Sequence, residues 1–356
     1  MAGTFRPRST WEPGSPRRGH EVRLLGWSST AGPAIDACLE FSSLSTPQLS
    51  PGLTLDDIWD ELVDPKLHGD ATVEEILTVA RSFRPDLLVI DCMMGAAFAA
   101  AGRLGLPTAA LVHVRYAPFV NIWGDGLMHA STLGLLSRAD LVLALTAPGF
   151  DDLPDVLPAN TTFVGPILAP AEENAPGLPE LVQPGPPWVL VSLSTTAQHQ
   201  QEALPTILEA VGALPVRALL TLGGVLPVET VAVPGNVVVR SFVPHDRVLP
   251  HMSAVVCHGG LSTVTTSLAH GVPLVCIPQG RDQAGNAERV TACGVGEALS
   301  PDAKAAEIAD SLSRVLSDSA TRAAARRFAA RDSGARAAEL VEGLLDANRT
   351  AFATTG

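Results

Sequence analysis

Short apolar runs recur along most of the chain, and segments with helical character separate them. Nine of these runs predict strands, at residues 22–27, 87–90, 108–114, 141–145, 188–193, 218–222, 237–242, 254–257 and 274–277. Four of the runs, at residues 87–90, 141–145, 254–257 and 274–277, are apolar at every position rather than at every second one, which is typical of strands that are buried on both faces of a sheet. Such strands, alternating with helices, predict an α/β fold built on parallel sheets.

Residues 166–187 divide the chain, because they are rich in proline and glycine and show neither helical nor strand periodicity. They predict a linker between an amino-terminal domain, residues 1–165, and a carboxyl-terminal domain, residues 188–334. Residues 335–356 are predicted to be mainly a final helix. The 356 residues are enough for two domains of ordinary size, and ligands of such sheets bind at the carboxyl ends of the strands.

The net charge and the placement of the cysteines argue against several classes of protein. The formal net charge of −13 argues against nucleic-acid binding, which needs a basic surface. The five cysteines include no C-x-x-C pair, so they predict a reducing compartment, without disulfides or a zinc site. No run of about 18 apolar residues is available to span a membrane, and residues 1–18 lack the apolar core of a secretory signal. We therefore expect a cytoplasmic protein with no stable membrane insertion.

The clearest chemical signal lies between the strand at 254–257 and a predicted helix at 261–270. His258, Gly259 and Gly260 form the connection, and the two glycines allow a sharp turn and a close approach of the backbone to a ligand. A helix amino terminus presents unpaired N–H groups and a partial positive charge, which suit a phosphate. Ser262 and Thr263 add hydroxyl groups there. The alternative interpretation is a capped helix in which His258 is hydrogen-bonded locally.

This block resembles the nucleotide-sugar signature of the family 1 glycosyltransferases. The matching residues extend over about forty positions, and they are His258-Gly259-Gly260, Thr263, Gly271-Val272-Pro273, Pro278, Asp282-Gln283, Asn286-Ala287 and Gly294. The resemblance implies the GT-B fold, in which two Rossmann-like domains with doubly wound parallel sheets face each other. It also implies that residues 335–356 cross back to the amino-terminal domain. Ser262 departs from the family, which usually has glycine there, but serine is itself favourable at a helix start.

The resemblance also implies a donor site. Phe242 would lie against the nucleotide base, and the backbone of Val243 would hydrogen-bond to it. The residues implied at the diphosphate are His258, Gly259, Gly260, Ser262 and Thr263, with Ser194 and Thr195 close to the phosphates. Asp282 and Gln283 would bind sugar hydroxyls. Two alternatives stay open, since Phe242 suits a core position at a strand end and Asp282 suits a helix N-cap. We expect no metal and no cofactor besides the nucleotide sugar.

Residues 84–113 and 139–166 resemble the first domain of the same family. There, the residue at the position of Asp91 supports a catalytic histidine on a loop after the first strand. Only seventeen residues precede Arg18 here, with three prolines, no histidine and no strand-like run. We therefore predict that the first strand, this loop and most of the first helix are absent or replaced, and that activity is reduced or absent. His113, near a strand's carboxyl end, is the candidate replacement base; the alternative is an ordinary pocket or core histidine.

The preferred function is an inverting, metal-independent glycosyltransferase. It would move a sugar from a dTDP- or UDP-sugar to a hydroxyl of a lipophilic natural product, such as a polyketide or macrolide. Trp59, Leu62 and Trp123 are candidates for the acceptor pocket. One alternative is a catalytically silent nucleotide-sugar-binding or partner protein derived from such an enzyme, and another is a nucleotide-sugar epimerase of the same fold. For each of these functions the chain could form a homodimer or bind a helper protein.

Overall fold

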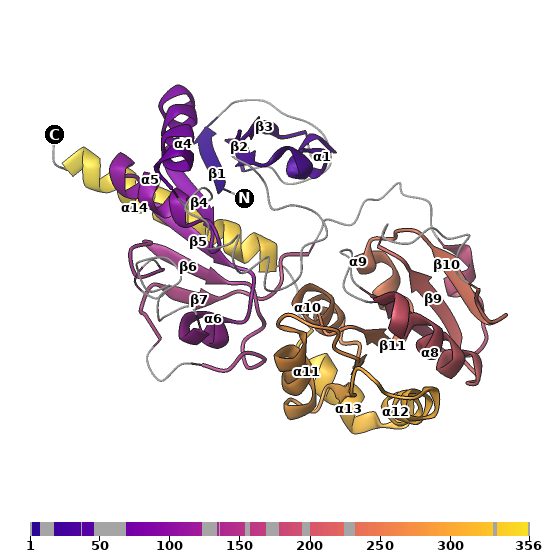
Figure 1. Cartoon of the computed structure of the whole chain (residues 1–356). Helices are drawn as coiled ribbons and strands as arrows, with labels where there is room; N and C mark the ends of the chain where they lie inside the picture. The colour runs from indigo at the N-terminus through magenta and orange to yellow at the C-terminus, as the bar shows by residue number, and fades with distance from the viewer. Residues whose placement is uncertain are drawn as a thin grey trace. The chain divides into compact units, whose positions relative to one another are not determined.

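The structure is a computed structural model that describes residues 2–7, 18–36, 38–45, 69–122, 134, 136–153, 157–168, 178–193, 200–223, 232–329 and 333–354. The chain divides into two compact units (Figure 1). Unit 1 contains Met1–Thr146, Asp152–Val164 and Gly334–Gly356. Unit 2 contains Ala147–Asp151 and Gly165–Ser333.

Unit 1 is built on a seven-stranded sheet of order β3-β2-β1-β4-β5-β6-β7. The strands are β1 (Ala2–Pro7), β2 (His20–Gly26), β3 (Glu40–Ser43), β4 (Leu87–Asp91), β5 (Thr108–Val112), β6 (Leu141–Ala144) and β7 (Thr161–Phe163). All neighbouring pairs are parallel except those of β1, which is antiparallel to both β2 and β4. The sheet is therefore mixed, whereas the sequence predicted a parallel one.

A strand precedes Arg18, although no apolar run in the sequence predicted one. Strand β1 lies between β2 and β4, pairing Phe5 with Val22 on one side and with Leu87 on the other. Its placement follows from pairing rather than from an apolar run, since two strand edges facing each other offer backbone donors and acceptors to a segment inserted between them. The edges of β2 and β4 are thereby covered in this structure.

Helices cover the sheet of unit 1. They are α1 (Ala31–Asp36), α4 (Asp70–Phe83), α5 (Gly95–Leu104), α6 (Tyr116–Ile122) and α14 (Ser333–Thr354). In α4 the buried positions recur at helical spacing from Thr72 to Phe83, which turns one apolar stripe to the core. Helix α14, the last of the chain, packs Ala337 against Leu143 and Val164 of this unit.

Unit 2 has a six-stranded parallel sheet of order β10-β9-β8-β11-β12-β13. Its strands are β8 (Trp188–Ser192), β9 (Arg217–Thr221), β10 (Val237–Arg240), β11 (Met252–Cys257), β12 (Leu274–Cys276) and β13 (Gly296–Ala298). Its helices are α8 (Gln200–Gly212), α9 (His245–Val248), α10 (Leu261–Ala269), α11 (Gln283–Ala292), α12 (Ala305–Ser317) and α13 (Ser319–Arg327). Neighbouring residues of β11 belong to two different apolar clusters, Val255 to one and Val256 to the other, so the sheet is buried on both faces.

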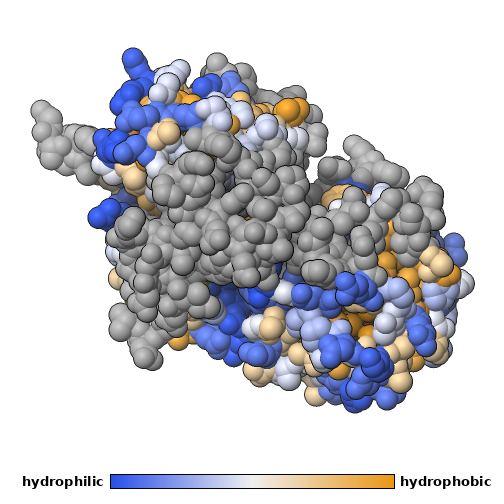
Figure 2. All heavy atoms as spheres, viewed as in Figure 1, coloured by the Kyte–Doolittle hydropathy of each residue, from blue (hydrophilic) through white to orange (hydrophobic). Residues whose placement is uncertain are grey.

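The described surface carries hydrophilic and hydrophobic residues side by side in the view of Figure 2. Within the described ranges, no helix is both long and apolar enough to cross a membrane.

Candidate functional site

A pocket of about 480 Å³ lies within unit 2, at the carboxyl ends of β8 and β9 and at the amino terminus of α10. This is the edge at which doubly wound sheets bind ligands. Its lining includes most of the predicted donor residues, namely Phe242, Val243, His258, Gly260, Ser262, Thr263, Asp282 and Gln283. It also includes Ser192, Thr221, His245, Thr266 and Arg281, to which the sequence analysis assigned no role. Ser194 and Thr195 lie outside the described residues.

The turn between β11 and α10 needs both of its glycines. Gly259 has a φ of +82°, in the left-handed region, and a Cβ there would lie 3.0 Å from the carbonyl oxygen of Gln283. A Cβ on Gly260 would overlap the imidazole of His258 at Nε2. The ring of His258 therefore lies directly over the Gly260 backbone, at the point where the helix begins.

The first turn of α10 is open to a ligand. Gly260 is its N-cap, and no described side chain at this position caps the first N–H groups. Later in the helix, the hydroxyls of Thr265 and Ser267 donate to backbone carbonyls one turn earlier. Ser262 and Thr263 instead line the pocket. The helix terminus thus offers unpaired N–H groups and two hydroxyl side chains to an anion.

His258 is a buried imidazole, and only 8% of the residue is exposed. Burial lowers its pKa, outweighing the opposing effect of a backbone hydrogen bond at Ser192, so the ring is neutral at neutral pH. Its Nδ1 has no hydrogen-bond partner among the residues that the structure describes. A neutral imidazole donates one hydrogen bond, and this one lies beside a helix amino terminus. Arg281 adds a positively charged side chain to the same pocket.

Asp282 is the N-cap residue of α11, yet its side chain makes no capping hydrogen bond in the described structure. Its Oδ2 instead accepts a hydrogen bond of 2.9 Å from Nδ2 of Asn286. The same Nδ2 donates to the carbonyl oxygen of Gly259 at 3.0 Å. Asn286 therefore joins Asp282 to the glycine turn, while Asp282 stays exposed at the pocket. Asp282 therefore occupies the N-cap position, as the capping alternative predicted, but its carboxylate is oriented by Asn286 and not by the first N–H groups of α11.

Gln283 is 2% exposed, and its Oε1 accepts hydrogen bonds from the backbone N–H groups of Gln279 and Gly280, at 2.7 Å and 3.2 Å. This carboxamide oxygen holds the loop that precedes α11. Gln283 lines the pocket.

Phe242 is 66% exposed and lines the pocket, so the alternative of a core residue is wrong. Val243 packs partly against the core of unit 2. Three residues after Phe242, the Nε2 of His245 lies 3.1 Å from Oγ of Ser192, and burial lowers the pKa of His245. The signal that could have found His245 was its position in the base-binding segment, two residues after Val243.

In unit 1, the structure brings Asp91 and His113 together. Asp91 ends β4 and His113 follows β5, and Nδ1 of His113 lies 3.1 Å from Oδ2 of Asp91. The other oxygen of Asp91, Oδ1, accepts the N–H of Met93 at 2.9 Å. Sγ of Cys92 lies 3.8 Å from the same Nδ1.

The protonation of His113 follows from these neighbours. Burial would lower its pKa, but interactions with Asp91 and Cys92 raise it to about 10. At neutral pH the imidazole is mostly protonated, and it accepts a proton only in the minor fraction of molecules that have lost one. The predicted acceptor residues Trp59, Leu62 and Trp123 lie outside the described residues.

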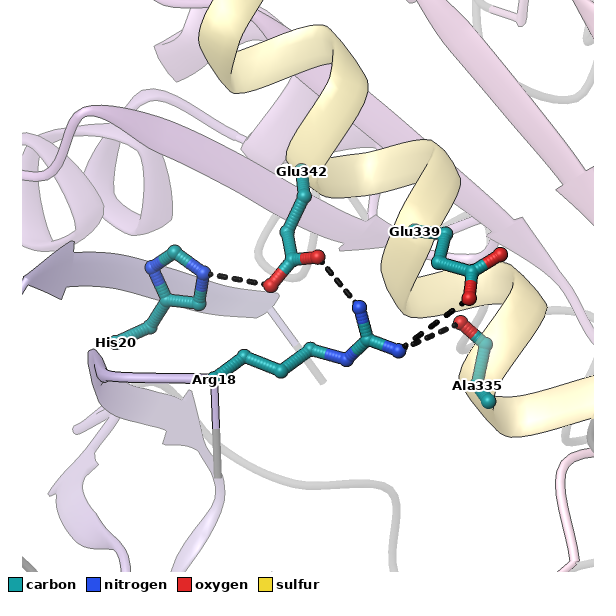
Figure 3. Close-up of polar contacts among 5 residues, drawn as sticks. All are labelled: Arg18, His20, Ala335, Glu339 and Glu342. Atoms are coloured by element: carbon teal, nitrogen blue, oxygen red, sulfur yellow. Dashed lines mark hydrogen bonds and ion pairs between the residues drawn. The ribbon is translucent and has the colours of Figure 1, made fainter. Parts of the chain in front are cut away.

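His20 contacts helix α14, as Figure 3 shows. Its Nε2 lies 3.0 Å from Oε1 of Glu342 in α14, and Arg18 donates to Oε2 of the same carboxylate at 2.6 Å. Arg18 also forms an ion pair with Glu339 at 3.7 Å. These contacts join the start of β2 to α14 within unit 1.

Comparison with known proteins shows which proteins this chain is similar to. Residues 205–346 match the family described as "Erythromycin biosynthesis protein CIII-like, C-terminal domain". The 4'-demethylrebeccamycin synthase of Lentzea aerocolonigenes is 32% identical over 250 residues, which are 68% of this chain and 55% of that protein. The chain is a homologue of family 1 antibiotic glycosyltransferases. It spans about half the length of the curated relatives that it matches first.

Solved structures agree on the fold. The calicheamicin glycosyltransferase CalG4 superimposes with a TM-score of 0.73 at 24% identity, over 91% of this chain and 90% of that one. The spinosyn rhamnosyltransferase SpnG complexed with thymidine diphosphate superimposes with a TM-score of 0.65 at 21% identity, over 86% and 87%. The predicted GT-B fold is confirmed.

Proposed function

We propose that this homologue transfers a sugar from a dTDP- or UDP-sugar to a hydroxyl group of a lipophilic natural product, with inversion at the anomeric carbon and without a metal ion in the reaction. The observation that best supports this function is the pocket of unit 2, in which a buried neutral His258 lies beside the uncapped start of α10. A diphosphate suits that environment, since backbone N–H groups, two hydroxyls and the Arg281 guanidinium surround it. The complex of SpnG with thymidine diphosphate supports a nucleoside diphosphate as the ligand.

The remaining residues proposed for the donor site contact different parts of the nucleotide sugar. Phe242 offers an exposed apolar ring to the base, and the backbone of Val243 offers hydrogen bonds to the base edge. Asp282, oriented by Asn286, accepts hydrogen bonds from sugar hydroxyls. Gln283, the next residue, also lines the pocket and would contact the sugar beside Asp282.

In the transfer step, the oxygen of the acceptor hydroxyl forms a bond to the anomeric carbon as the bond from that carbon to the phosphate oxygen breaks. The electron pair of the broken bond stays on the diphosphate, where α10, His258 and Thr263 stabilise the added charge. The acceptor proton passes to Nε2 of a neutral His113. Asp91 holds the opposite ring nitrogen and stabilises the imidazolium that forms.

A second candidate function is a catalytically silent nucleotide-sugar-binding or partner protein. It is favoured by the protonation of His113, because interactions with Asp91 and Cys92 raise the pKa of His113 to about 10. Only a minor fraction of molecules then carries a neutral base at neutral pH.

One experiment separates the two candidates. The full chain is incubated with dTDP- and UDP-sugars and a panel of hydroxylated polyketides and macrolides, in chelator, and glycosylated products are measured by mass spectrometry. Products whose anomeric configuration is opposite to that of the donor support the transferase. Binding of the nucleotide without product supports the silent protein, and retained configuration contradicts the proposed displacement.

A further inference from the structure

We infer that Asp91, Cys92 and His113 form a binding site for Zn²⁺ at the carboxyl edge of the unit 1 sheet. A carboxylate oxygen, a thiol sulfur and an imidazole nitrogen lie within 4.8 Å of one another there. Nδ1 of His113 is 3.1 Å from Oδ2 of Asp91 and 3.8 Å from Sγ of Cys92. The spacing along the chain predicted no such site, because the ligands come from the ends of two different strands.

The distances suit a tetrahedral ion. Zinc binds nitrogen and oxygen ligands at about 2.0–2.2 Å and sulfur at about 2.3 Å, so neighbouring ligand atoms lie about 3.3–3.6 Å apart. The two separations from Nδ1 of His113 lie within a few tenths of an ångström of that range. The Asp91 oxygen and the Cys92 sulfur lie within 4.8 Å of each other, and an ion between the three ligands would draw these two closer. The mixed set of thiolate, imidazole and carboxylate also favours zinc over magnesium or calcium, which prefer oxygen ligands.

The backbone holds the three residues in place. Strands β4 and β5 pair in parallel, with Asp91 opposite Leu111, and the N–H of Cys92 donates to the carbonyl oxygen of Leu111 at 2.9 Å. His113 lies two residues beyond Leu111. Ligands carried by paired strands lose little freedom when an ion binds, which increases affinity.

Access to the cluster is from one side. Cys92 is 2% exposed and forms its floor. The side chains of His113 and Asp91 are 47% and 23% exposed, so an ion reaches the three ligand atoms from the solvent side. Three protein ligands leave a fourth position for water, as in zinc sites that are not closed.

Zinc binding has a consequence for the dyad, and this consequence rests on the proposed function. The ion takes Nδ1 of His113, the same atom that Asp91 holds in the dyad. With Nδ1 on the metal, the neutral ring carries its proton on Nε2, and it has no free nitrogen to accept the acceptor's proton. Zinc therefore inhibits transfer at this site.

The binding claim is tested without turnover. The metal-free full chain, kept reduced with a phosphine, is titrated with Co²⁺, which replaces zinc and absorbs visibly in a tetrahedral site. We expect one equivalent to give intense visible bands and a near-ultraviolet thiolate band, and Zn²⁺ to abolish both. Cys92→Ala should remove the thiolate band, and Asp91→Asn should weaken Co²⁺ binding by at least about tenfold while conserving side-chain volume.

Cys293→Ala is the matched control, because Cys293 is a partly exposed thiol outside the cluster. It should leave both bands unchanged. Absence of the bands in the original chain, or the same bands in folded Cys92→Ala, overturns the inference. If Cys92→Ala does not fold, unchanged Co²⁺ affinity in Asp91→Asn and in His113→Gln overturns it equally. Nucleotide binding is measured separately. Its absence would contradict the proposed function, but it would not affect the evidence for the metal site.

Discussion

Two histidines follow directly after strands at the carboxyl edges of the two sheets, and their environments make them chemically opposite. His258 follows β11 in unit 2, where burial lowers its pKa and outweighs the opposing effects of Ser192 and Asp282. His113 follows β5 in unit 1, where Asp91 at 3.1 Å and Cys92 raise the pKa to about 10. The same residue type, directly after a strand in each case, is thus neutral in one unit and mostly protonated in the other at neutral pH.

The two sites also differ in how they are encoded. The pocket of unit 2 depends on short continuous segments, because the anion site proposed there is a glycine turn and the start of a helix. The cluster of unit 1 depends on side chains from two strands that meet only in the folded sheet. A backbone-based site is therefore visible in a sequence, whereas a side-chain pair is visible only once the strand order is known.

The largest expected effect is on turnover in unit 1. His113→Ala should reduce the rate of transfer by about 10²–10⁴-fold, the usual contribution of a general base, while nucleotide affinity stays unchanged. Steady-state rates and calorimetry measure the two quantities. His20→Gln, which removes a histidine paired with Glu342 rather than Asp91, is the control and should retain the rate. A fully active His113→Ala would show that another group is the base.

In unit 2, Asp282→Ala should weaken the binding of intact nucleotide sugar by about 1.5–3 kcal/mol, the range for a hydrogen bond to a charged group. Binding of the free nucleoside diphosphate should change little, because Asp282 is proposed to contact only the sugar. Calorimetry with both ligands measures the difference. Equal losses for the two ligands would mean that Asp282 acts by holding Asn286 and the glycine turn.

The glycine turn provides the next test. Gly260→Ala places a Cβ against the imidazole of His258 and should destabilise the chain by about 1–3 kcal/mol, with weaker nucleotide binding. Gly102→Ala in α5 is the matched control, since a Cβ there meets no described atom within 4 Å. That change should leave the stability equal or raise it by up to about 1 kcal/mol. Urea unfolding of both variants measures the contrast, and equal stability would contradict the described turn.

The smallest expected effect is a pH dependence of stability in unit 2. His245 and His258 have pKa values below the ordinary value of 6.5 because they are buried. The unfolded chain therefore binds protons near pH 6.5, whereas the folded chain binds them only at lower pH. Their contribution to stability is complete above about pH 6.5 and is lost as the pH falls toward the lowered folded pKa values.

Urea unfolding between about pH 8 and pH 5 measures this loss. The double variant His245→Gln and His258→Gln should show a smaller decline than the original chain. An identical decline in both proteins would assign the pH dependence to other groups.

Strand prediction succeeded where burial determined composition. The continuous apolar runs that became β4, β8 and β12 were found within one residue at each end. The missed strands β3, β7 and β13 have three or four residues each and are partly exposed, so they lack such a run. Strand β1 was missed because its position depends on two neighbouring edges.

Prediction of the site shows the same division. The turn from His258 to Gly260 and the exposed Phe242 were found, because they belong to one continuous motif. The link from Asn286 to Gly259 was not, since it joins residues that lie 27 positions apart. The pairing of Asp91 with His113 was only partly predictable. Each residue was placed at a strand end, but their contact requires β4 and β5 to be neighbours in the sheet.

The central claim is that the unit 2 pocket binds a nucleoside diphosphate through the start of α10 and His258. Its most direct test is isothermal titration of the full chain with dTDP and UDP in the presence of chelator. We predict binding of at least one of them with one ligand per chain, weakened by about 1–3 kcal/mol in His258→Ala. Absence of binding by either nucleotide, or unchanged affinity in a folded His258→Ala variant, would contradict the account.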